Sequence, residues 1–141
     1  MIETDSNKNS LKEIRKREKA TKEAALRAKC EALAIERYGE DTIKKLSNQH
    51  KGLWYLSVEG DEEGVIEALA IMKPIDRHIL SYASTKIDGE GLYAFLESAM
   101  REVMLPEYSD AVIIDDDEYF IPAANTFNKI LEVKKATLLK R

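Results

Sequence analysis

The chain of 141 residues is poor in the residues on which turn-rich and disulfide-linked folds depend. It has only 6 glycines and 3 prolines, which argues against a sandwich or barrel of many short strands. Its one cysteine, Cys30, cannot form a disulfide within the chain, so a reducing compartment is expected. No segment approaches the roughly 18 apolar residues of a bilayer-spanning helix. Residues 1–10 contain no apolar core of a secretory signal, so neither membrane insertion nor export is expected.

The sequence also has few of the residues that usually carry catalysis. The two histidines, His50 and His78, do not stand at metal-ligand spacing from each other or from Cys30, so a zinc site has almost no ligands. Spacing alone leaves a Cys–His nucleophile pair open, but Cys30 stands among Ala and Leu, which is typical of a buried packing residue. Gly60 and Gly64 flank acidic residues, which would repel phosphate. We therefore expect no catalytic residue, no cofactor and no metal, and predict that the protein is not an enzyme.

Charge is unevenly distributed along the chain, whose formal net charge is −4. Residues 1–51 hold 13 Lys and Arg against 9 Asp and Glu, whereas residues 52–141 hold 9 against 17. A basic N-terminal segment can bind nucleic acid. Here the basic residues are interleaved with acidic ones, and phosphate binding gains affinity from uncompensated cations. A solvated helix face is therefore favoured, and a nucleic-acid-binding module is the weaker alternative.

The N-terminal third predicts a charged helical arm over residues 10–51, preceded by a disordered tail over residues 1–9. Ser10 is a good N-cap with Glu13 three residues on, and Gly39 is a plausible stop. The apolar face is thin, so we expect the second half of the helix to dock. The first half is expected to project or to meet a partner, including a second copy of the chain. Residues 41–51 predict a short second helix.

Residues 52–141 predict a second unit, a β-hairpin packed on a small helical bundle. Residues 53–59 and 65–72 read as two strands around a Gly-bounded turn, although helix stays open for the second run. Helices are expected over residues 76–87 and 92–105. A final helix of about 20 residues is expected to follow the acidic run 115–118 and to include Leu138. The connector 108–114 could pair as a short strand. The predicted fold class is α+β, mostly helical.

Two groups of residues are candidates for binding a partner. Trp54 and Tyr55 are neighbours on one strand and so face opposite sides. One of them is expected to be exposed for a partner, or both to be packed in the core. Lys73 and Arg77 could form a small basic spot, either paired with acidic residues in the fold or contacting an acidic partner.

The acidic run formed by Asp115, Asp116, Asp117 and Glu118 has two interpretations. Carboxylates suit Mg²⁺ or Ca²⁺, which leaves a small metal-dependent enzyme open. The favoured interpretation is an Asp N-cap with further negative charge at the positive end of a helix dipole.

The order of these features resembles a group of small proteins from tailed bacteriophages and prophages, some of them described as tail-assembly-chaperone-like. The resemblance covers roughly residues 53–141. It rests on the aromatic strand and acidic turn, on Lys73-Pro74 with Arg77 opening a helix, on the run 114–120, and on the closing helix 130–141. It implies a non-catalytic phage protein made in the host bacterial cytoplasm, and it leaves retention in the virion as an open alternative. It also implies binding to a tape-measure protein or to another tail or head component.

Overall fold

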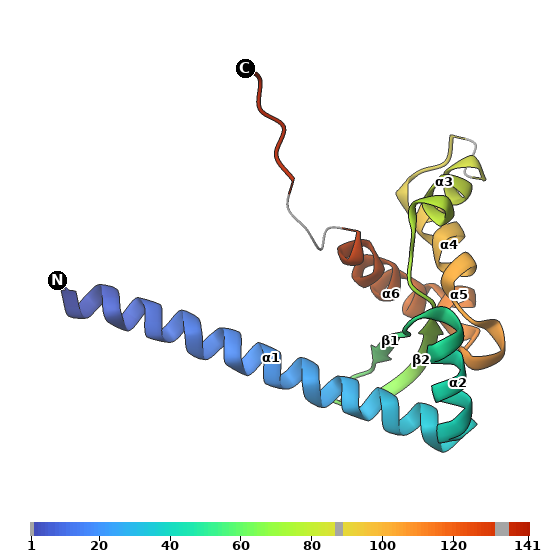
Figure 1. The fold of residues 1–141 in the computed structure, drawn as a ribbon, viewed down its shortest axis with the longest axis horizontal. Coiled ribbons are helices and arrows are strands. Elements are labelled where there is room, and N and C mark those ends of the chain that lie inside the picture. The colour runs from blue at the N-terminus through green and yellow to red at the C-terminus, as the bar shows by residue number, and fades with distance from the viewer. Residues whose placement is uncertain (1, 87–88, 132–135) are drawn as a thin grey trace.

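A computed structural model describes residues 2–86, 89–131 and 136–141 and confirms the α+β class (Figure 1). The strands are β1 (Trp54–Glu59) and β2 (Ile66–Met72). The helices are α1 (Ile2–Tyr38), α2 (Glu40–His50), α3 (Arg77–Thr85), α4 (Leu92–Val103), the 3-10 turn η1 (Pro106–Tyr108), α5 (Val112–Asp115) and α6 (Asp117–Ile130). Within this described part, no helix combines the length and hydropathy needed to cross a membrane.

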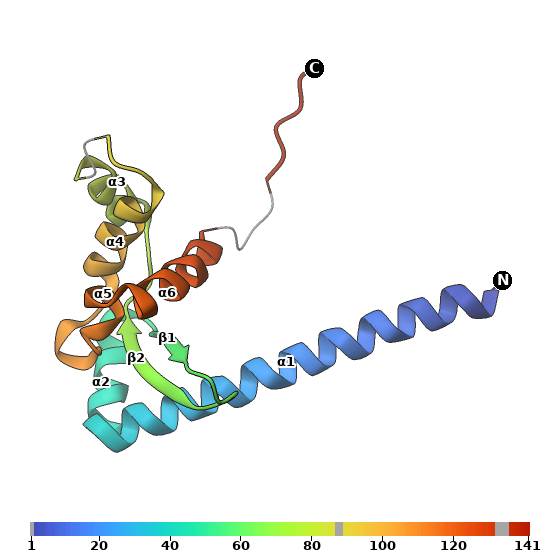
Figure 2. The same cartoon turned by 180° about the vertical axis from the view of Figure 1, so that it is seen from behind.

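Helix α1 is long and straight, and its N-terminal half projects away from the rest of the molecule (Figures 1 and 2). Its C-terminal half packs on the hairpin and on α2, whereas residues 10–25 are exposed, as the thin apolar face predicted. The helix begins at Ile2, so the prediction of an N-cap at Ser10 is wrong and residues 2–9 are helical. Residue 1 of the predicted disordered tail lies outside the described residues. No proline or glycine stands before Gly39, and extending a helix that already exists is far easier than starting one.

The two strands form an antiparallel hairpin, as predicted, which settles the open question over residues 65–72 in favour of a strand. Side chains alternate between the two faces of the sheet. One face carries Leu69 and Ile71 and packs against α1. The other carries Leu56, Val58 and Ala70 and packs against α4 and α6. The hairpin is therefore the middle layer between the long helix and the helical bundle.

The outer edge of β2 is covered by the chain between α4 and α5. Leu105 N–H donates to Ile71 O at 2.9 Å, and Asp110 N–H donates to Leu69 O at 2.9 Å. The prediction that the connector 108–114 contains a strand is wrong, since η1 and α5 occupy it. Ser109 and Asp110 form hydrogen bonds with the backbone of β2 through their backbone and side-chain groups. The edge of β2 therefore needs no third strand to pair its backbone groups.

The closing helix is shorter than predicted. Helix α6 ends at Ile130, and residues 136–141 have no regular structure. Leu138 is 99% exposed and Leu139 is 82% exposed, so the apolar spacing that predicted a continued helix has no surface to pack on. Without tertiary packing a short helical segment is marginal in water. Lys134 and Lys135, also expected in this helix, lie outside the described residues.

Candidate protein-interaction surface

The second half of α1 meets the hairpin in a surface that combines buried apolar contacts with hydrogen bonds and an ion pair. Cys30 and Ala34 of α1 are buried against Leu69 and Ile71 of β2. Burial raises the pKa of the Cys30 thiol, while a hydrogen bond with Ser57 acts in the opposite direction. Cys30 is thus a packing residue, as its sequence context indicated, and its thiol is kept in the neutral form.

A polar clamp joins the last turn of α1 to the covered edge of β2. Nη1 of Arg37 lies 3.1 Å from both carboxylate oxygens of Asp110. Oδ2 of Asp110 also accepts a hydrogen bond from the Leu69 N–H at 2.8 Å. Partial burial on its own would lower the pKa of Arg37, but the Asp110 carboxylate raises it above the ordinary value. One carboxylate therefore orients both the helix and the strand.

A second polar contact joins α1 to β1. The hydroxyl of Tyr55 in β1 donates to Oε2 of Glu31 in α1 at 2.7 Å. Burial, followed by this hydrogen bond and the negative charge of Glu31, raises the pKa of Tyr55 well above its ordinary value. The phenol therefore stays protonated and serves as a donor that ties β1 to the long helix.

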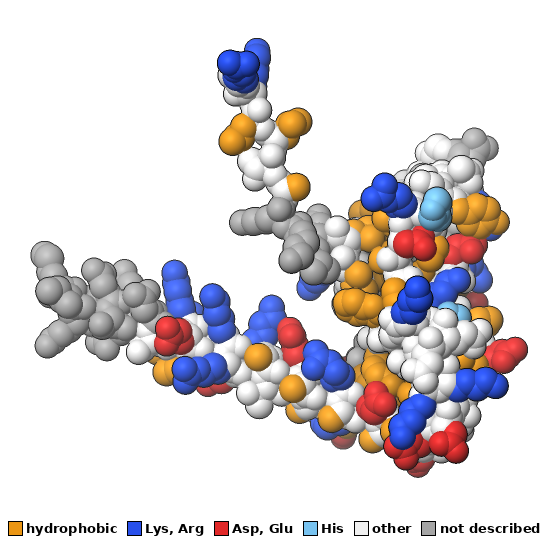
Figure 3. Space-filling view, viewed as in Figure 1, with side chains coloured by type: hydrophobic (Ala, Val, Ile, Leu, Met, Phe, Trp, Pro, Cys, Tyr) orange, Lys and Arg blue, Asp and Glu red, His pale blue; other side chains and the backbone are white. Residues whose placement is uncertain are grey.

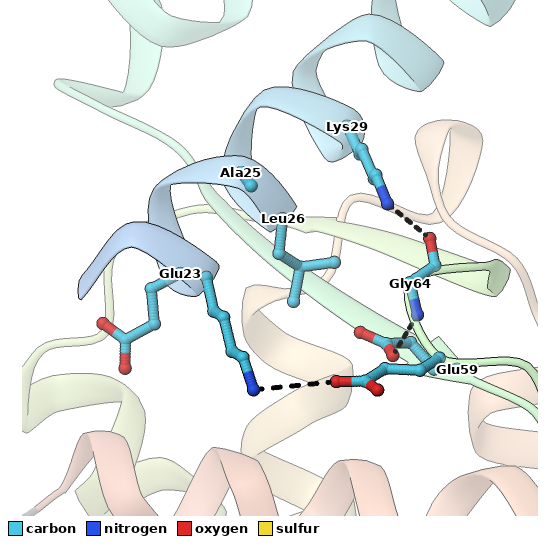
Figure 4. A pocket seen from close by; sticks show the side chains of 8 residues that line it. Glu23, Ala25, Leu26, Lys29, Glu59 and Gly64 are labelled. Atoms are coloured by element: carbon cyan, nitrogen blue, oxygen red, sulfur yellow. Dashed lines mark hydrogen bonds and ion pairs between the residues drawn. The ribbon is translucent and has the colours of Figure 1, made fainter. Parts of the chain in front are cut away.

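An open hollow of about 400 Å³ lies between α1 and the hairpin turn (Figure 4). Leu26 of α1 points into it, and its walls carry acidic and basic side chains. Lys29 Nζ donates to Gly64 O at 3.1 Å, and Gly64 N–H donates to Oε2 of Glu59 at 3.0 Å. Lys22 Nζ lies 3.9 Å from Glu63, in a contact between strongly exposed groups. The hollow is an apolar floor with a charged rim, which suits a peptide side chain.

The first half of α1 carries a different kind of surface. Leu11 is 54% exposed and Ile14 is 49% exposed, and they lie on one side of the helix. Residues 10–25 hold six Lys and Arg and three Glu, and Figure 3 shows side chains of both signs along this segment. No described residue of the body packs on Leu11 or Ile14.

The structure separates the predicted pair of aromatic residues. Tyr55 packs toward α1, whereas Trp54 lies on the opposite face and is 46% exposed. The prediction that they face opposite sides is confirmed, and the alternative of core packing for both is wrong. Trp54 pairs with Met72, so it stands at the same end of the sheet as Lys73.

The predicted basic and acidic partner-binding residues do not form ion pairs with one another among the described residues. Lys73 is half-buried and Arg77 opens α3, and neither takes part in an ion pair with any residue in the described ranges. Asp115, Asp116 and Asp117 are all exposed at the junction of α5 and α6.

The acidic run acts locally as the helix-start interpretation predicted. Asp116 is the N-cap of α6, and its Oδ1 accepts a hydrogen bond from the Glu118 N–H at 3.0 Å. Asp117 and Glu118 occupy the first turn, at the positive end of the helix dipole. Across residues 2–86, 89–131 and 136–141, no three His, Cys, Asp or Glu side chains converge as metal ligands would.

Sequence reasoning missed the residues of the polar clamp. Ser109 and Asp110 follow a proline turn, where they resemble ordinary loop residues. Their role depends on Arg37, which is 73 positions from Asp110 in the chain. The only local signal is that two short polar side chains stand next to each other between two helices.

Comparisons with known proteins add no relative. No protein family, no curated protein and no solved structure matches the chain.

Proposed function

We propose that this protein is a non-catalytic bacteriophage assembly protein, of the tail-assembly-chaperone-like kind, that acts by binding other virion components. The resemblance of residues 53–141 supports the class of protein. The observation that carries the mode of action is the exposed first half of α1, which extends beyond the body that anchors it (Figure 1).

The length of α1 gives it reach. Its 37 residues span about 55 Å at the usual helical rise. The docked half is fixed by Cys30 and Ala34 against the sheet and by the clamp of Arg37. The C-terminal half of α1 is therefore docked on the body, and its N-terminal half is accessible to a partner.

The composition of the arm indicates what kind of partner it suits. A phosphate backbone would favour an excess of uncompensated positive charge. In residues 10–25, three Glu stand among six Lys and Arg, so half of the positive charge around Leu11 and Ile14 is compensated. This suits a helix of another protein with a narrow apolar stripe and charged flanks better than it suits a phosphate backbone. We propose a tape-measure protein, or another tail or head component, as that partner.

Binding of the purified full chain to purified tape-measure, tail and head proteins tests the proposal. The double variant Leu11→Asp/Ile14→Asp is expected to weaken binding at least about tenfold, because it removes two apolar contacts from the interface. The matched control is Lys16→Asp/Ala20→Asp on the opposite side of the helix, which is expected to bind like the wild type. All four positions are exposed, so thermal unfolding is expected to be unchanged.

Two results would overturn the proposal: no binding of the wild type to any of these components, or equal loss of binding in both double variants. Mass spectrometry of purified particles separates an assembly factor from a structural component. An assembly factor is expected in assembly intermediates and not in the finished particle.

A further inference from the structure

The outer edge of β1 has backbone groups without a partner strand. Leu69 and Ile71 direct their N–H and C=O groups to Leu105, Ser109 and Asp110. Opposite residues of an antiparallel pair alternate between bonded and non-bonded types, so Tyr55 and Ser57, their partners, face away from β2. Among the described residues, nothing forms a backbone hydrogen bond with Tyr55 or Ser57 along this edge.

The outer edge of β1 is accessible, and both faces of the sheet beside it are covered by helices. Helix α1 covers one face of the sheet and α6 the other, and no other ribbon of the described chain runs beside β1 in either view (Figures 1 and 2). The hollow between α1 and the hairpin turn opens next to the end of β1, since Glu59 and Leu26 both line it. Trp54 is exposed on the opposite face. An added strand would therefore find an apolar contact on each side.

The chain itself carries a segment with matching chemistry, which we term the tail (residues 136–141). Leu138 and Leu139 are adjacent, so in a strand they point to opposite faces. One would lie on the face of the sheet toward α1, where Leu26 lines the hollow, and the other on the opposite face, toward α6. Figure 3 shows apolar side chains along the tail and basic ones at its end.

Charge fixes the direction of the added strand. Beyond β1 lies the acidic tip, formed by Asp61, Glu62 and Glu63, all exposed. Lys140 and Arg141 follow the two leucines, so a tail running parallel to β1 would bring two basic residues to the acidic tip. In the structure the tail lies apart from the body, so it is accessible to another molecule (Figures 1 and 2).

We propose that the outer edge of β1 binds the tail of a second copy of this chain as an added parallel β-strand. Backbone groups of Tyr55 and Ser57 supply the hydrogen bonds, the two leucines supply the apolar contacts, and the acidic tip selects the basic end. This inference does not rest on the proposed function, because it uses neither Leu11 nor Ile14.

Sedimentation velocity of the full chain over a concentration series tests it. The wild type is expected to associate reversibly. The edge variant Ser57→Pro removes one outward N–H without touching the ladder to β2, and the tail variant Leu138→Asp/Leu139→Asp removes the apolar contacts. Each is expected to stay monomeric, whereas the control Leu138→Val/Leu139→Val associates like the wild type. A mixture of the edge and tail variants is expected to associate again, because each supplies the half that the other lacks.

A charge exchange gives a test that does not depend on the proline variant folding. Glu62→Lys/Glu63→Lys changes only exposed side chains and is expected to weaken association about tenfold. Adding Lys140→Glu/Arg141→Glu to the same chain is expected to restore it. A wild type that stays monomeric at every concentration would overturn the proposal. So would association that survives the tail variant, or a mixture of edge and tail variants that does not associate. A tail docked on its own body would give the monomeric wild type.

Discussion

Asp110 and Arg37 lie 73 positions apart in the chain, yet one carboxylate holds both the long helix and the sheet in place. Its two oxygens lie 3.1 Å from Arg37 Nη1, and Oδ2 also accepts the Leu69 N–H at 2.8 Å. The second contact is the more consequential, because the Leu69 N–H is part-buried and has no regular strand beside it. The Asp110 carboxylate thus accepts the hydrogen bond that a neighbouring strand would otherwise accept from Leu69.

Truncating the two partners is therefore expected to have unequal effects. Asp110→Ala leaves the Leu69 N–H without an acceptor and is expected to lower the free energy of unfolding by about 1.5–3 kcal/mol. Arg37→Ala removes a partly exposed ion pair and is expected to cost about 1 kcal/mol or less. Urea unfolding of both variants measures the difference. Asp110→Asn keeps an acceptor oxygen and is expected to lie between them; an Arg37→Ala effect as large as that of Asp110→Ala would contradict the assignment.

The turn between α1 and α2 depends on Gly39. Its φ of 91° and ψ of 148° lie in a region that residues with a side chain rarely adopt. Gly39→Ala is expected to lower the free energy of unfolding by about 1–3 kcal/mol through backbone strain. The control is Gly91→Ala, where φ is −81° and no atom lies within 4 Å of the added methyl group. The control is expected to change stability by no more than about 0.5 kcal/mol, and equal losses at the two sites would refute the role of strain at Gly39.

Local patterns were enough to predict most elements of this fold. The β-branched and aromatic run of β1, the acidic turn and Pro74 predicted the hairpin, and Gly39 marked the end of α1. The thin apolar face around Cys30 predicted that only half of α1 would dock. These features depend on near neighbours in the sequence, so one sequence is sufficient to read them.

Features that depend on distant partners could not be read in this way. The apolar spacing of Leu138 predicted a continued helix, but whether a surface meets that side chain is a tertiary property. The connector 108–114 has strand-like residues, yet the side chains of Ser109 and Asp110 complete the edge of β2 instead. The alternation of side chains along a strand was enough to predict that Trp54 and Tyr55 face opposite sides. It could not predict the hydrogen bond between Tyr55 and Glu31.

The hydrogen bond between Tyr55 and Glu31 predicts a dependence of stability on alkaline pH. Because the folded state raises the pKa of Tyr55, its contribution is fully present below the ordinary tyrosine pKa of about 10 and is lost as the pH rises above it. The free energy of unfolding of the wild type is therefore expected to fall more steeply above that pH than that of Tyr55→Phe. Urea unfolding at a series of pH values measures both slopes. Glu31→Gln removes the carboxylate but leaves the burial, so an intermediate slope is expected; identical slopes for all three proteins would contradict the prediction.

The two apolar clusters on either side of the sheet predict that α1 can open without the rest of the molecule. Cys30 belongs to the cluster under α1, whereas Phe127 belongs to the cluster between the sheet and the bundle. Because Cys30 is buried, a disulfide reagent such as dithionitrobenzoate is expected to react with it only when α1 lifts off. Asp110→Ala weakens that docking directly and is expected to speed the reaction about ten- to hundredfold.

A comparison with Phe127→Leu separates local opening from global unfolding. This variant trims the other cluster and is expected to lower the free energy of unfolding without changing how often α1 lifts away. The rate at Cys30 is then expected to stay close to the wild-type rate even when urea unfolding shows a loss of stability similar to that of Asp110→Ala. If the two variants speed the reaction equally for equal losses of stability, Cys30 is exposed only by global unfolding, and the long helix and the body form a single cooperative unit.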